Sequence, residues 1–459
     1  MASVSLPGLA SGLDSAALIT ALLAIDAQSQ TLLKNKATVA STTVSALQGL
    51  NTQVAALGTL AATSAKAGGL DFYTATSTSA KVVATAAAGA SNGTIDIVVD
   101  KLAQAQSGVT APMTAWNGTA ITIVGSTGTA TEITAKSASL DDVVTAINAS
   151  AAGVTATKVA AGKDADGNVQ YRLQLNGKET GADSKFTAYA GTKDAVTAGT
   201  ATNVLTQPGA ATIREAQDAS VKLFAGTTAE QVLTSKTNTF ADLLPGVSVT
   251  VSGVSTDPVT VSIARDTAKT SEAAAALISS VNTTLAYIQI RTVSTASTDA
   301  DGKPILSGGA FTGDRTTRDV TQKILDAASA PVDGRSPSEF GISITKTGTM
   351  VFSAEKFNAA FAKDPVGTQK VVAEIAGRLA AAATAISDKN TGTVSTKITG
   401  TQSTVDSLTE QVSKWDDRLA TRKVNLERYY SAFEVRMGNM NAQMSWLTAQ
   451  VDALQASKD

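Results

Sequence analysis

Carboxylates have the widest scope for chemistry in this sequence, because the chain contains no histidine and no cysteine. That composition excludes thiol nucleophiles, imidazole-based catalytic triads, and zinc sites built from cysteine and histidine. Two pairs of adjacent acids remain, Asp141 with Asp142 and Asp416 with Asp417. Neighbouring residues on a helix point to different faces, so we expect these acids to be solvated or to cap helices, and not to act as a general acid and base.

One loop resembles a calcium site at first sight, since Asp164, Asp166 and Asn168 occupy its first, third and fifth positions. A calcium loop of this kind needs glycine at the sixth position and a glutamate at the twelfth, where this chain has Val169 and Leu175. The segment is therefore interpreted as a hairpin turn. The Gly-Lys pairs of the chain lack the upstream glycine of a phosphate-binding loop, so no metal and no cofactor are expected.

Composition narrows the possible partners. The 37 basic residues are balanced by 39 acidic ones, and a net charge of −2 offers no excess of positive charge for nucleic acid. The opening residues show no secretory signal, and no run of 18 apolar residues predicts insertion into a membrane. At 459 residues, the chain has room for about three domains.

The elements that organise the chain are helices at its two ends. Apolar residues between positions 394 and 454 recur at alternating steps of four and three, which is the pattern of a coiled-coil seam, with Thr401 and Arg422 as the exceptions. Two successive four-steps around Leu426 form a stutter that relaxes the supercoil. The stripe needs partner helices, either in an intramolecular bundle or from other chains. Its C-terminal part comprises Val412, Trp415, Leu419, Leu426, Tyr430, Phe433, Met437, Met440, Met444, Leu447, Val451 and Leu454.

The first sixty residues predict a second long helix, with Asp14 or Ser15 as its N-cap. Leu18, Leu22, Ile25 and Leu32 follow at heptad-compatible spacing, and a looser apolar face from Val44 to Leu57 extends it. Because both ends carry such stripes, we expect them to pair as an antiparallel hairpin, with the middle of the chain inserted between them.

The middle of the chain is β-rich by its period-two alternation and its β-branched residues. Residues 94–102 and 121–124 predict strands, and Ser139 predicts the cap of a short helix. Residues 247–251 and 259–263 alternate valine or isoleucine with polar residues on either side of Gly253, and we expect them to pair as a hairpin. The fold class is therefore α+β and multidomain, with terminal helices forming a coiled-coil leg and a helical bundle and with β-rich domains inserted mid-chain.

Five segments in order carry a family resemblance. They are GLASGLDSAALITALLAID at 8–26, SLDDVVTAINASAAGVTATKV at 139–159, TFADLLPGVSVTVSG at 239–253, FGISITKTGTMVFSAEKFNAAFAKDP at 340–365 and YYSAFEVRMGNMNAQMSWLTAQVDAL at 429–454. Together they resemble the flagellar hook-associated protein 2 family, the filament caps of bacterial flagella. The 139–190 region is similar to a small repeat found in flagellins and cap proteins.

The resemblance implies a non-enzymatic cap at the distal filament tip, built as a ring of several copies that retains exported flagellin while it folds. Flagellin, the hook-associated junction proteins and an export chaperone on the C-terminal helix are the implied partners. Export would follow the flagellar type III route without a cleaved signal. The apolar stripe residues of both terminal helices are the expected contacts for self-assembly and flagellin.

The resemblance and the pattern together predict four parts. We expect a leg at 1–40 and 411–459, a helical bundle at 41–74 and 266–410, a β-rich head domain at 75–110 and 213–265, and an inserted head domain at 111–212. Two other functions remain open at this point. A hook–filament junction protein also pairs its terminal helices, and a surface adhesin can carry a β head on a coiled stalk, although it would need a signal or an anchor. An enzyme would have to work without histidine and cysteine.

Overall fold

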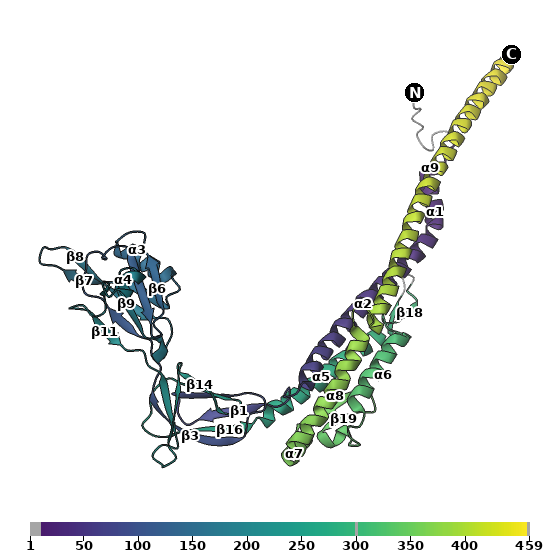
Figure 1. Ribbon diagram of the computed structural model, residues 1–459. Coiled ribbons are helices and arrows are strands. Elements are labelled where there is room, and N and C mark those ends of the chain that lie inside the picture. The colour runs from purple at the N-terminus through teal and green to yellow at the C-terminus, as the bar shows by residue number, and fades with distance from the viewer. Residues whose placement is uncertain (1–10, 299–301, 457–459) are drawn as a thin grey trace. The chain divides into compact units, whose positions relative to one another are not determined.

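The structure is a computed structural model that describes residues 11–298 and 302–456. The chain forms two compact units, one made of Met1–Leu70 and Ser271–Asp459 and the other of Asp71–Thr270. The first is a helical bundle built from both ends of the chain, and the second is β-rich (Figure 1). The expected fold class, terminal helices with β-rich domains inserted mid-chain, is confirmed.

The bundle has a core of apolar side chains at helical spacing. On α2 (Gln28–Ala65), Leu47, Leu50, Val54 and Leu57 recur every three or four residues, and all four are fully buried. They share one core with five other helices, as the looser apolar face predicted. These helices are α5 (Thr267–Thr292), α6 (Arg315–Ser329), α7 (Ala354–Lys363), α8 (Pro365–Ser387) and α9 (Thr393–Ala456). The unit also contains α1 (Ser15–Asp26), which contributes no residue to this core.

Two close contacts fix α5 in this core. A Cβ on Gly49 would lie 1.9 Å from the Tyr287 hydroxyl, so a glycine is required where α2 meets α5. The Tyr287 hydroxyl donates to the carbonyl of Ala46 at 3.1 Å. By length and composition α5 could cross a membrane, but its buried residues Leu277 and Val281 belong to the bundle core, which accounts for its apolar character.

A small hairpin of β19 (Ile342–Ile344) and β20 (Met350–Phe352) leads into α7, as the sequence predicts. Ser353 caps α7 by accepting from the N–H of Lys356. The side chain of Asn282 on α5 donates to the Met350 carbonyl and accepts from the Met350 N–H, at 2.7 and 2.9 Å. This pair of hydrogen bonds holds the hairpin on α5. A second hairpin, of β17 (Thr295–Thr298) and β18 (Pro304–Ser307), follows α5.

The turn between α8 and α9 sets the start of the longest helix. Asp388 accepts from the N–H groups of Asn390 and Thr391 and from the Thr391 hydroxyl. The hydrogen bonds from Thr391, first from its N–H and then from its hydroxyl, hold the pKa of the Asp388 carboxyl below its usual value. The N–H of Gly392 donates to the Asp388 carbonyl, and a Cβ on this glycine would lie 2.5 Å from that oxygen. The turn therefore needs glycine next to the first residue of α9.

The β-rich unit contains two separate cores. The first lies between a five-stranded sheet of order β1-β16-β3-β12-β13 and a three-stranded sheet of order β14-β15-β2. These strands are β1 (Tyr73–Ser77), β2 (Val82–Ala86), β3 (Gly93–Lys101), β12 (Ala219–Leu223), β13 (Gln231–Ser235), β14 (Thr239–Leu244), β15 (Val247–Val251) and β16 (Val259–Arg265).

The predicted hairpin between residues 247–251 and 259–263 is wrong, although both strands exist. β15 pairs with β14 and β2, whereas β16 pairs with β1 and β3. The alternating valines of the two strands are buried in the same core. The two stripes therefore pack face to face between sheets, and an alternating pattern alone does not distinguish this arrangement from pairing along one edge.

The second core joins two four-stranded sheets, β10-β9-β5-β6 and β11-β4-β8-β7, with α3 (Leu140–Ala149). Ser139 caps α3 by accepting from the N–H of Asp142, and β7 and β8 form the expected hairpin. At its turn, hydrogen bonds from Asn168 hold the pKa of Asp164 below its usual value. The remaining elements are β4 (Ser107–Val109), β5 (Ala120–Gly125), β6 (Ala130–Thr134), β7 (Val154–Lys163), β8 (Val169–Gly177), β9 (Phe186–Ala190), α4 (Lys193–Thr197), β10 (Thr202–Asn203) and β11 (Ala211–Arg214).

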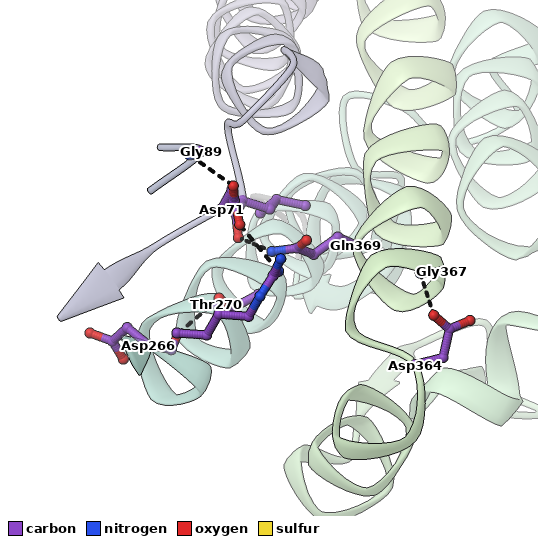
Figure 2. Close-up of polar contacts among 9 residues, drawn as sticks. Asp71, Gly89, Asp266, Thr270, Asp364, Gly367 and Gln369 are labelled. Atoms are coloured by element: carbon purple, nitrogen blue, oxygen red, sulfur yellow. Dashed lines mark hydrogen bonds and ion pairs between the residues drawn. The ribbon is translucent and has the colours of Figure 1, made fainter. Parts of the chain in front are cut away.

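Carboxylates hold backbone and side-chain groups in place in both units (Figure 2). In the β-rich unit, Asp71 accepts from the N–H of Gly89 at 2.9 Å and forms an ion pair with Arg265 at 3.3 Å. In the bundle, Asp364 accepts from the N–H of Gly367 and so caps α8. These contacts give both acids a structural role.

Candidate assembly surface on the terminal helices

The two ends of the chain run antiparallel to each other along α9. Three contacts define the order: Ser11 donates its N–H to Glu434 at 3.2 Å, Asp26 pairs with Arg422 at 3.4 Å, and Gln30 donates to Asp416 at 2.5 Å. Residue numbers rise on one helix as they fall on the other. The expected antiparallel pairing of the termini is therefore confirmed.

Glu434 is the most buried charged residue of this contact, with 7% of its surface exposed. One of its oxygens accepts from the Ser11 N–H, and the other accepts from the Ser11 hydroxyl. A buried carboxylate is costly unless such donors satisfy it. The Ser11–Glu434 contact therefore helps to fix the register between α9 and the N-terminal segment.

The face of the N-terminal helices that meets α9 differs from the predicted one. Ser15, Ile19 and Gln30 are buried, while Leu18, Ile25 and Leu32 are exposed and Leu22 is half-buried. One residue along a helix turns the side chain by about 100°, so the two stripes lie on adjacent faces. The prediction that the Leu18–Leu32 stripe forms the intramolecular seam is wrong. As a contact for other chains, that stripe stays a prediction.

The polar contacts explain this choice of face. Asp26 pairs with Arg422, and Gln30 donates to Asp416. Both residues lie within two positions of Ile25 or Leu32, the residues that the apolar pattern placed in the seam. Gln30 is buried against α9, whereas the Asp26–Arg422 ion pair is about half exposed, so the Gln30–Asp416 hydrogen bond is the contact that favours this face and register. Sequence reasoning missed the contacts of Ser11, Asp26, Gln30 and Glu434, and it expected Asp416 to be solvated or to cap a helix, because no spacing pattern links polar residues that are distant in sequence.

The burial of the apolar stripe on α9 decreases toward the C-terminal end of the helix. Leu426 is buried, and most other stripe positions up to Met437 are half-buried, while most of their neighbours other than Glu434 and Gly438 are exposed. That inner set contains Val412, Trp415, Leu419, Tyr430, Phe433 and Met437. α1 and α2 meet at an angle of 47° beside Ala27, and both contact α9. The intramolecular bundle left open by the sequence therefore accounts for this part of the stripe.

Beyond Met437, α9 continues without a neighbouring helix among those that the structure describes (Figure 1). Its stripe there is exposed at Met440, Met444, Leu447 and Val451, with Met444 at 59% and Leu447 at 52%. Their spacing of four, three and four residues is that of a coiled-coil seam. The backbone of Leu454 is helical, and its side chain lies outside the described residues. The end of α9 therefore presents a seam ready for helices of another chain.

A groove of about 660 Å³ lies between α1 and α9. Ile19, Leu23 and Tyr430 supply its apolar lining, and Lys423 and Glu427 stand at its rim. Within residues 11–298 and 302–456, no group of three histidine, cysteine or acidic residues is placed to hold a metal. The arrangement suits helix packing: an apolar seam with a charged border is what an incoming helix requires.

Two isoleucines six residues apart, Ile19 and Ile25, provide a matched test of the seam. Replacing Ile19, which is 9% exposed, by alanine should lower the free energy of opening α1 by about 2 kcal/mol, since a packed side chain is lost. Replacing Ile25, which is 63% exposed, should change it by less than about 0.5 kcal/mol. Amide hydrogen exchange over residues 15–26 measures both. Equal effects of the two substitutions would show that the helix faces are assigned wrongly.

Comparisons of the sequence and of the fold with known proteins all find members of one family. The family model described as flagellar hook-associated protein 2 N-terminus matches residues 11–106, and the one described as its C-terminus matches residues 216–442. The chain is 26% identical to the flagellar hook-associated protein 2 of Escherichia coli O157:H7 over 478 residues and to that of strain K12 over 481, covering all of each chain. The solved D1-D2-D3 domains of the Escherichia coli flagellar cap protein share its fold, with a TM-score of 0.61 and 22% identity over 78% of this chain and 99% of that one.

Proposed function

The chain belongs to the flagellar hook-associated protein 2 family, and we propose that several copies form a ring at the distal tip of the flagellar filament. It is a flagellar filament cap protein, so its place is the flagellum. In the proposed mechanism the cap retains exported flagellin and promotes its folding and polymerisation. The family assignment does not favour the two other candidates, a hook–filament junction protein and a coiled-stalk adhesin.

The exposed seam at the end of α9 carries this proposal. A helix of 64 residues is about 96 Å long, and its last turns extend past every other helix that the structure describes. Met440, Met444, Leu447 and Val451 there offer adaptable apolar contacts, and methionine suits a surface that must release one partner and accept another. We infer that this segment inserts among flagellin helices at the filament end.

The outward stripe of Leu18, Ile25 and Leu32 is the second proposed assembly surface. These side chains recur every seven residues and are exposed, as a helix awaiting a coiled-coil partner would show. Neighbouring copies and flagellin are its proposed partners. Hook-associated junction proteins, which precede the filament, and an export chaperone covering the apolar C-terminal helix complete the proposed set. No role for nucleic acid or membrane insertion is proposed.

The proposed action involves no covalent chemistry. A chain without histidine and cysteine lacks the groups that most often carry nucleophilic or general acid–base catalysis. Among its described carboxylates, Asp388 and Asp164 close turns, and Glu434 accepts from Ser11. We also propose that it reaches the tip through the flagellar type III route without a cleaved signal.

We propose four functional parts within the two units. The leg comprises 1–40 and 411–459, and the bundle comprises 41–74 and 266–410. The head domains comprise 75–110 with 213–265, and 111–212. The two separate cores of the β-rich unit support a division of the head into two domains.

Removing this chain from its cell tests the proposal directly. Cells without it are expected to release flagellin into the medium and to lack filaments, because exported subunits leave the tip before they fold into the lattice. Expression of the wild-type chain should restore filaments, and immunoblots of medium and sheared filaments measure both. Filaments of normal length without the chain would contradict the proposal.

A further inference from the structure

Three asparagines of this chain are followed directly by glycine: Asn92, Asn117 and Asn176. An Asn-Gly pair is prone to spontaneous deamidation, because glycine has no side chain to hinder attack of its backbone nitrogen on the asparagine side chain. The reaction requires a glycine N–H that is free to turn toward that side chain. The three pairs can therefore be compared by what the fold does to each glycine.

The fold restrains Asn176 and Gly177 most strongly. The Gly177 N–H donates to the carbonyl of Gln106 at 2.9 Å, and the Asn176 side-chain oxygen accepts from the Ser107 hydroxyl at 2.7 Å. Both residues lie in β8 and are in register with partners on β7. Attack by the Gly177 nitrogen therefore has to break several contacts first.

The restraint on Asn92 and Gly93 is weaker. Asn92 is exposed, but Gly93 is the first residue of β3 and is paired with Ile263 of β16. The sheet therefore holds the backbone of Gly93 in an extended conformation. This pair is the natural comparison for Asn117, since both pairs are followed by threonine.

Asn117 and Gly118 form an exposed link just before β5. Gly118 has a φ of +81°, and a Cβ added to it would meet no atom within 4 Å. Among the residues that the structure describes, none bonds to the Asn117 side chain and none accepts from the Gly118 N–H. The two reacting groups therefore have room to approach each other without the loss of a protein hydrogen bond.

The residues on either side of this link are held in place. The Trp116 N–H donates to the carbonyl of Ala138 at 2.9 Å, and its indole N–H donates to that of Ala120 at 3.3 Å. The Thr119 carbonyl accepts from the N–H of Ala135 at 2.8 Å. Trp116 is 4% exposed and belongs to the second core of the β-rich unit. A change in the length of the link therefore acts on a core residue.

We propose that Asn117 is the principal site of spontaneous deamidation in the folded protein. The Gly118 nitrogen bonds to the side-chain carbonyl carbon of Asn117, and the bond from that carbon to the amide nitrogen breaks. The amide nitrogen leaves as ammonia and takes the proton of the Gly118 nitrogen with it. One solvent water then opens the five-membered imide ring to give aspartate or isoaspartate. The step needs no oxidant, reductant or enzyme.

Either product changes the β-rich unit. Both add one negative charge to an exposed turn, and isoaspartate also lengthens the main chain by one carbon atom between Trp116 and Thr119. The modified protein is therefore separable from the original by ion exchange. This inference follows from the fold of the β-rich unit and does not depend on the proposed function.

Incubation of the full-length folded protein in mildly alkaline buffer, followed by peptide mapping with mass spectrometry, measures conversion at all three sites in one sample. Asn117 should convert at least about tenfold faster than Asn176, because Asn176 and Gly177 must first lose two or more hydrogen bonds. Asn92 should convert at a rate between the two. The same chain in urea is the control, since unfolding removes these restraints and should bring the three rates to within about threefold of one another.

Two glutamine variants separate the sites. Asn117→Gln should remove most of the acidic species that ion exchange resolves after incubation, because the longer side chain closes its ring far more slowly. Asn92→Gln is the matched control, since Asn92 is also exposed, and it should leave most of those species. Circular dichroism should show both variants folded.

Three results would overturn the proposal. The first is conversion of Asn92 or Asn176 in the folded protein as fast as that of Asn117. The second is an undiminished acidic fraction in Asn117→Gln. The third is an Asn117 that stays intact in the folded protein over the time in which it converts in urea.

Discussion

Replacing Met444 and Leu447 together by glutamate is expected to abolish capping and to leave the fold intact. Both side chains are more than half exposed, so the substitutions remove no core contact. Each would lose about 1.5–3 kcal/mol of burial on docking, which together weaken binding to the filament end by roughly a hundredfold or more. Cells carrying the double variant should be non-motile and should release flagellin, as swimming assays and immunoblots of the medium would show.

A matched control adds the same charge to the other side of the helix. Ala442 and Ala449 are exposed and lie on the face of α9 opposite the stripe, so their double glutamate variant should remain motile. Thermal unfolding should be unchanged in both double variants. Equal loss of motility in the two would mean that added charge alone disrupts the helix end and that the stripe has no special role.

The second large effect is expected from Leu419→Pro in the middle of α9. Proline removes the hydrogen bond to the carbonyl of Trp415 and clashes with the preceding turn, which costs about 3 kcal/mol or more. The antiparallel pairing with α1 and α2 should open beyond that point, including the Asp26–Arg422 and Ser11–Glu434 contacts. Capping should then be lost.

The β-rich unit should be unaffected by this change, because its two cores contain no residue of α9. Proteolysis is expected to remove the C-terminal part of α9 rapidly and to leave residues 71–270 resistant. Leu419→Met keeps the stripe and the helix, and should behave as wild type to within about 1.5 kcal/mol. Motile cells with normal filaments carrying Leu419→Pro would refute the role given to α9.

Sequence periodicity predicted the long helices because their apolar residues recur over many turns. The stripe from Val394 onward and the core positions Leu47 to Leu57 of α2 lie where their spacing places them. The same reasoning failed at Leu18, where the neighbouring Ile19 is buried instead, and at Ile25, where the neighbouring Asp26 pairs with Arg422 of α9, which is distant in sequence. Spacing alone does not reveal such partners.

The β-rich unit shows a similar limit. Alternation identified β3, β5, β15 and β16 as strands, because one buried face imposes a period of two. The pairing of these strands is set by contacts between distant segments, such as β16 with β1, and these leave no local signature.

The location of the protein on intact flagella tests the central claim most directly. Gold-labelled antibodies against the β-rich unit, residues 71–270, should mark the distal ends of filaments, one cluster at each tip. Label at the junction between hook and filament, or label spread over the cell body, would contradict the assignment of this chain to the filament cap.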